Sequence, residues 1–143
     1  MNVFKILPVL ATLGLGVSPA MAAGPSLVTV ITASEAQVQM MSLVLTLQAA
    51  KQGASAHILL CGPGGDLALD EAPASATAPQ KPTGASPRDL MAKAMQAGVK
   101  IDVCAIYLPN KDLPAEALIE GVGVAKPDAM AAELMAADRV LSF

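Results

Sequence analysis

The 143-residue sequence has very few aromatic side chains: it contains no Trp, one Tyr and two Phe. The core must therefore be aliphatic, and the chain has no set of rings on which bases or sugars would stack. Charged residues make up only 15% of the sequence, and the 12 acids outnumber the 9 bases. Nucleic acids and anionic membrane surfaces attract basic patches, so this balance argues against both as partners.

Metal-ligating residues are also scarce, because the sequence has one His, His57, and two Cys, Cys61 and Cys104. Three such residues do not make a structural zinc site, and we expect no metal. His57 lies in the middle of an expected strand. A role as catalytic base or as a partner of a Cys is conceivable, but a lone strand histidine is more often a hydrogen-bonded structural residue, which is the interpretation that we favour.

Residues 1–22 have the layout of a secretory signal peptide. Lys5 precedes an apolar run from Ile6 to Val17, and the small-residue pattern Ala20-Met21-Ala22 follows. The run has roughly a dozen residues, against the ~20 that a membrane-spanning helix requires. We predict cleavage after Ala22, a periplasmic or secreted protein, and no membrane association afterwards. The remaining residues, 23–143, form a single domain, and the formal charge changes from −3 to −4 because the signal peptide holds one base and no acid.

Strand and helix patterns alternate along this domain. Alternation of this kind is typical of an α/β protein, in which helices connect parallel strands and cover both faces of their sheet. A capping box at Ser34 and Gln37 should begin the first helix, whose apolar residues cover most of its circumference and predict that it is largely buried. The expected strands are residues 27–32, 54–60, 99–106, 121–124 and 139–143, and the expected helices are residues 35–52, 87–97, 114–120 and 127–137.

One segment departs from this pattern. Residues 71–85 are rich in Ala, Pro, Ser and Thr and have almost no large apolar side chain. Such a composition buries too little apolar surface to order itself. We expect a flexible surface loop within the single domain, since neither flanking part is large enough to be a domain alone.

Both cysteines are expected where parallel sheets gather reactive groups, at the carboxyl ends of strands. Cys61 ends the second strand, and Cys104 lies near the end of the third. Three interpretations remain open. Each Cys is a small buried hydrophobe; or the two form a disulfide, which requires their Cα atoms to lie within about 7 Å; or Cys104 is a reactive thiolate whose pKa is lowered by a helix N-terminus or by a cation such as Lys111.

Three segments together resemble the DsrE/DsrF-like family, which includes sulfur-relay and YchN-type proteins. They are the helix ending Ala49-Ala50-Lys51-Gln52-Gly53, the Gly-Val step and strand Ala97-Gly98-Val99-Lys100-Ile101-Asp102-Val103-Cys104, and the terminus Ala137-Asp138-Arg139-Val140-Leu141-Ser142-Phe143. The resemblance covers essentially all of residues 23–143. It implies a three-layer α/β/α sandwich with a five-stranded parallel sheet, and assembly into homotrimers or homohexamers.

In the sulfur-relay branch of that family, the cysteine matched by Cys104 accepts a sulfane sulfur as a persulfide. The resemblance therefore implies a relay of reduced sulfur on Cys104, with Cys61 as an auxiliary or resolving thiol and a protein as sulfur donor or acceptor. Such a transfer needs no cofactor, because the sulfur itself is the electrophile. The alternative is a non-catalytic oligomeric binding or assembly protein on the same scaffold, with structural or disulfide-bonded cysteines.

Overall fold

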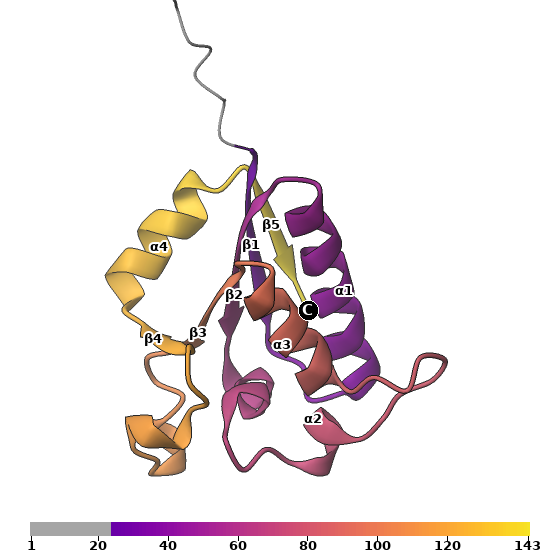
Figure 1. Ribbon diagram of the computed structural model, residues 1–143. Helices are drawn as coiled ribbons and strands as arrows, with labels where there is room; N and C mark the ends of the chain where they lie inside the picture. Colours follow the sequence, from indigo (N-terminus) through magenta and orange to yellow (C-terminus); the bar gives the residue numbers. More distant parts are fainter. Residues whose placement is uncertain (1–23) are drawn as a thin grey trace, which may run out of the picture.

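The computed structural model describes residues 24–143, so the predicted signal peptide at residues 1–22 lies outside the described residues. Five parallel strands form one sheet in the order β4-β3-β2-β1-β5 (Figure 1). This confirms the predicted five-stranded parallel sheet. The strands are β1 (Ser26–Ile31), β2 (Ser55–Leu60), β3 (Lys100–Cys104), β4 (Gly123–Ala125) and β5 (Arg139–Ser142), and the helices are α1 (Ala36–Lys51), α2 (Ala74–Thr77), α3 (Pro87–Gln96) and α4 (Pro127–Ala136).

Helices cover both faces of the sheet, as the α/β/α prediction requires. Helices α1 and α3 lie together on one face, and α4 lies on the other (Figure 1). The larger aliphatic core lies under α1 and α3, where Ile31, Ile58 and Met91 are fully buried. The cluster under α4 is smaller, and Met130 is the one buried residue of that helix. No helix within residues 24–143 combines the length and the apolar content needed to span a membrane.

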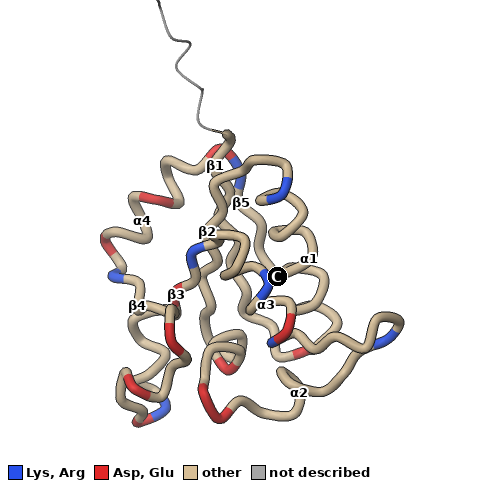
Figure 2. The backbone as a smooth tube through the Cα atoms, in the orientation of Figure 1, with Lys and Arg blue, Asp and Glu red and all other residues tan. Residues whose placement is uncertain are grey.

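Helix α1 differs from its prediction. Its N-cap is Glu35, without a side-chain capping bond, so the predicted capping box at Ser34 is wrong. Polar Gln39, Ser42 and Thr46 are buried, whereas the apolar Met41 and Leu45 are 53% and 43% exposed. The hydroxyls of Ser42 and Thr46 and the side-chain N–H of Gln39 form hydrogen bonds, among them a 2.7 Å bond between the hydroxyls of Thr46 and Thr29 on β1, whereas the side-chain oxygen of Gln39 has no partner. The helix carries no charged residue before Lys51 (Figure 2), so the exposed Met41 and Leu45 lie on an outer face that is otherwise uncharged up to that residue.

Helix α3 follows its prediction closely. Ser86 and Asp89 form a reciprocal capping box, and Leu90, Met91 and Ala94 face the core. Gly98, with φ of +84°, ends the helix in the left-handed conformation that glycine adopts at little cost.

Two connecting segments differ from their predictions: residues 71–85 contain more regular structure than expected, and residues 114–120 contain less. Residues 71–85 include the short helix α2, whose Ala76 is buried in the core. The helix predicted at residues 114–120 is a single 3₁₀ turn, Ala115–Ala117. Both segments connect core elements. The cysteines, the cavity and the polar network described below lie on or next to β2, β3, β4 and α4.

Candidate functional site

A disulfide joins Cys61 to Cys104 at the carboxyl edge of the sheet. Cys61 directly follows β2, and Cys104 is the last residue of the neighbouring strand β3. Leu60 pairs with Val103 in the parallel register, so the next residues along the two strands, Cys61 and Cys104, lie side by side. Their Cα atoms are 5.1 Å apart. Of the three interpretations left open by the sequence, the structure therefore has the disulfide.

An apolar cavity of about 390 Å³ lies beside the disulfide, between the sheet and α4. Cys104 lines it and Cys61 does not. Its other walls include Leu59 of β2, Ala125 of β4 and Met130 of α4. The two linked sulfurs are thus inequivalent with respect to this cavity, because Cys104 lines it and Cys61 does not.

The loops that follow the two cysteines are tied together by Tyr107. Its hydroxyl donates a 2.6 Å hydrogen bond to Oδ1 of Asp66, which lies in the 3₁₀ helix Gly62–Ala68 after Cys61. The ring of Tyr107 covers Gly65 so closely that a Cβ at that position would collide with it. Burial, together with the Asp66 carboxylate, raises the pKa of the Tyr107 hydroxyl, so it remains a proton donor in this bond. This contact therefore links the segment that follows Cys61 to the segment that follows Cys104.

Lys111 joins the same arrangement. Its ammonium lies 2.5 Å from Oδ1 of Asp66 and 5.5 Å from the centre of the Tyr107 ring, a cation–π distance. Lys111 therefore lies on the loop that leaves Cys104, paired with a carboxylate. Its predicted role in stabilising a Cys104 thiolate stays a prediction, since the cysteines are oxidised in this structure.

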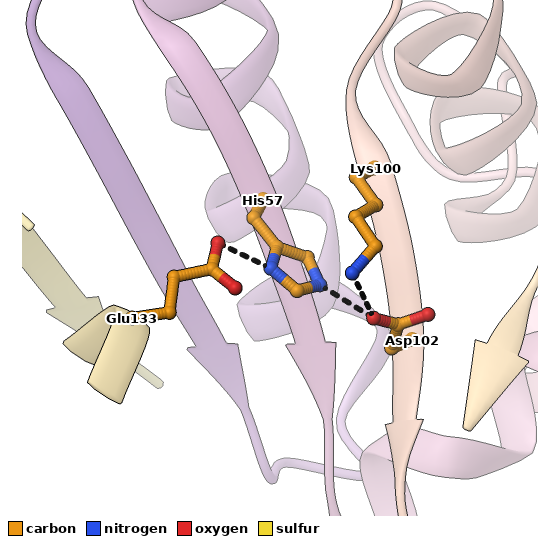
Figure 3. A network of polar contacts seen from close by, with 4 residues as sticks. All are labelled: His57, Lys100, Asp102 and Glu133. Atoms are coloured by element: carbon orange, nitrogen blue, oxygen red, sulfur yellow. Dashed lines mark hydrogen bonds and ion pairs between the residues drawn. The ribbon is translucent and has the colours of Figure 1, made fainter. Parts of the chain in front are cut away.

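A polar network crosses the face of the sheet under α4 (Figure 3). The His57 ring lies between two carboxylates: Nδ1 is 2.6 Å from Oε1 of Glu133 on α4, and Nε2 is 3.0 Å from Oδ2 of Asp102 on β3. The first contact is a hydrogen bond. The second has an ion-pair distance but not the angle of a hydrogen bond, so Asp102 acts on the ring electrostatically. The prediction that His57 is hydrogen-bonded is confirmed, and its structural role stays a prediction.

Lys100 completes this network. Its ammonium lies 2.8 Å from Oδ2 of Asp102, and that contact raises the pKa of the lysine. Cys61 follows His57 by four residues, about 13 Å along an extended chain, so the ring is not a hydrogen-bond partner of either sulfur. Sequence reasoning missed Asp102 and Glu133, although the alternation of β3 could have placed Asp102 on the face of Cys104.

The fold and this site define a class: a small α/β/α protein with a five-stranded parallel sheet and a cysteine pair at its carboxyl edge. No family model matches the sequence, and no curated protein matches it significantly. Solved structures do match. YchN from E. coli superimposes with a TM-score of 0.66 at 18% identity, covering 84% of this chain and 99% of YchN.

A second match is MTH1491 from Methanobacterium thermoautotrophicum, a protein of unknown function. Its TM-score is 0.60 at 14% identity, and the match covers 83% of this chain and 99% of MTH1491. At these identities the comparison establishes the fold. The chain has the DsrE/DsrF-like fold of YchN, as its sequence resemblance predicted.

Proposed function

We propose that this protein binds and relays sulfane sulfur as a persulfide on Cys104, with Cys61 as the resolving thiol. The observation that carries the proposal is the inequivalence of the two linked sulfurs: Cys104 borders the apolar cavity, and Cys61 does not. The fold shared with YchN and the sequence resemblance to relay proteins support the same assignment.

Loading starts from the reduced protein. The Cys104 thiolate attacks the outer sulfur of a donor persulfide, R–S–SH, so that a new bond forms from Sγ to that sulfur. The S–S bond of the donor breaks, and the donor leaves as the thiolate R–S⁻. The outer sulfur keeps its proton, and the reaction needs no cofactor because the S–S bond accepts the electron pair.

Unloading has two outcomes. An acceptor thiolate can attack the outer sulfur and restore the Cys104 thiolate, which completes the relay. Without an acceptor, the Cys61 thiolate attacks Sγ of Cys104 and expels hydrosulfide, which leaves the Cys61–Cys104 disulfide. The persulfide is the oxidant in this second step, and its reverse, attack of hydrosulfide on the Cys104 side of the disulfide, reloads the protein.

The proposed setting is an oxidising compartment, periplasmic or extracellular, where disulfides persist. In keeping with the sequence resemblance, we propose that the mature chain acts as a homotrimer or homohexamer that exchanges sulfur with a donor or acceptor protein. A native mass spectrum of the exported protein reads both the mature N-terminus and the number of subunits. A full-length monomer would contradict both parts.

The first test is persulfide labelling of reduced wild type, Cys104→Ser and Cys61→Ser with a low-molecular-weight persulfide. Cys61→Ser should gain and keep the mass of one sulfur atom on the peptide that contains Cys104. Wild type should gain it only until Cys61 expels it as hydrosulfide, and Cys104→Ser should gain none. Circular dichroism of each variant checks folding. Equal labelling of Cys61→Ser and Cys104→Ser would remove Cys104 as the carrier.

A second candidate function follows from the disulfide itself, which can serve as a structural crosslink in a binding or assembly protein. The cysteines are 43 residues apart in sequence. On a chain-entropy estimate, closing a loop of that size stabilises the folded state by about 4 kcal/mol. This candidate predicts that both single variants lose stability equally and that neither they nor reduced wild type take up sulfur.

A further inference from the structure

We infer that the sulfur donor for Cys104 is an uncharged, apolar organic persulfide, and not an ionic sulfur compound. The inference rests on the proposed function and specifies its substrate class. It comes from the cavity on the Cys104 side of the disulfide, whose position makes it the route to that sulfur.

No charged side chain lines this cavity. The sheet provides Leu59 and Ala125, and α4 provides Met130 and Leu134. The volume of about 390 Å³ lies within the range of small-molecule sites, which are mostly apolar with few polar groups. The one distinctive group in the wall is the sulfur of Cys104.

The rim of the cavity is apolar as well. Ile106, two residues after Cys104, lines the cavity and is 69% exposed. A large aliphatic side chain held in solvent beside a reactive sulfur extends the apolar surface outward from the cavity. An apolar donor would cover Ile106 on entry and gain the free energy of removing that surface from water.

An ionic donor would lose hydration in this cavity without gaining a partner. Two of the nearby cations are paired with carboxylates: Lys111 with Asp66, and Lys100 with Asp102. Lys126 lines the neighbouring cavity, which also contains Asp102 and Glu133. Thiosulfate or the persulfide of glutathione therefore meets no countercharge in the wall of the cavity beside Cys104.

The transfer follows the loading reaction described under the proposed function, in which R is now an apolar group. The Cys104 thiolate takes the outer sulfur of R–S–SH, the donor S–S bond breaks, and R–S⁻ leaves and is protonated by solvent. The apolar walls hold R while the outer sulfur, which projects toward Cys104, is transferred.

The test compares benzyl persulfide with glutathione persulfide on the reduced full-length protein. Each labelling rate is divided by the rate of the same donor with free N-acetylcysteine, which removes intrinsic differences in reactivity. The normalised rate for benzyl persulfide should be at least about tenfold higher, since burial of two methylene-sized groups already corresponds to that factor. Equal normalised rates would overturn the inference and leave the proposed function intact.

A pair of adjacent α4 variants sharpens the test. Leu134→Glu places a carboxylate in the cavity wall, and Met135→Glu places one on the next residue, which is 88% exposed and does not line the cavity. Leu134→Glu should abolish the preference for benzyl persulfide, and Met135→Glu should retain it. If both variants retain the preference, the cavity is not the donor site. If neither donor labels Cys104 or causes hydrosulfide release in wild type, the proposed function fails and the inference with it.

Discussion

His57 shows how single residues on the α4 face depend on one another. His57 is 4% exposed and Asp102 is 6% exposed, so both side chains are removed from water and need partners. Glu133 accepts the hydrogen bond from Nδ1, and Lys100 balances the charge of Asp102. The network therefore joins α4 to β2 and β3 through polar contacts at the place where its apolar packing is thin.

The substitution His57→Leu should lower the free energy of unfolding by about 2 kcal/mol, because it leaves the buried carboxylate of Asp102 with one partner fewer. The loss is at the low end for a buried ion pair, since Lys100 still faces Asp102 and the Glu133 side chain is 41% exposed. Urea unfolding measures it.

Glu133→Gln is the matched control for this variant. It retains an acceptor for Nδ1 and should cost less than about 1 kcal/mol, as expected for a half-exposed contact. An unchanged unfolding midpoint for His57→Leu would mean that the network contributes nothing to stability.

Residue-level prediction from the sequence succeeded where spacing fixes position and failed where distant residues meet. Cys61 and Cys104 were placed at strand ends because each follows an apolar run, and parallel strands end at one edge. The disulfide was one of three interpretations, since the sequence does not show that β2 and β3 are neighbours. Glu133 lies 76 residues from His57, and no local pattern links them.

At the scale of elements, the start of α3 illustrates a local signal that determines structure. Asp89 accepts hydrogen bonds from the backbone N–H and the hydroxyl of Ser86, and these bonds, the backbone one foremost, lower the pKa of its carboxyl from 3.8. A lowered pKa in the folded state means that the carboxylate stabilises the fold above its unfolded pKa. That contribution is lost as the pH falls from about 3.8 through the folded value.

Asp89→Asn should therefore remove part of the acid sensitivity of the protein. Below about pH 4 the free energy of unfolding of wild type should fall more steeply than that of the variant, while above pH 5 the difference between them stays constant. Asp128→Asn is a suitable control because Asp128 lies in the first turn of α4, where no side chain caps the helix. Parallel pH profiles for wild type and Asp89→Asn would contradict the assignment.

Helix α1 shows the limit of such signals. Its apolar residues predicted a largely buried helix, but Met41 and Leu45 are exposed and Gln39, Ser42 and Thr46 are inside. When apolar residues surround a helix, periodicity does not select the inner face, and the selection is made by tertiary contacts such as the bond from Thr46 to Thr29. In helix α3 the apolar stripe and the capping box determine the inner face and the first residue of the helix.

At the scale of the whole molecule, alternation of strands and helices was sufficient to predict the α/β class, because parallel strands require helical crossovers. Strand order was not predictable from the pattern. It decides the chemistry, since β2 and β3 must be adjacent for the two cysteines to meet. The same order places β4 and α4 around the cavity beside Cys104.

The most direct test of the central claim measures hydrosulfide release. Reduced wild type and Cys61→Ser are loaded with a persulfide donor, freed of excess donor, and followed without an acceptor. Wild type should release one hydrosulfide for each Cys61–Cys104 disulfide that forms, and Cys61→Ser should hold its sulfur on Cys104. Loss of the sulfur from both proteins at the same rate, or disulfide formation without hydrosulfide, would contradict the account.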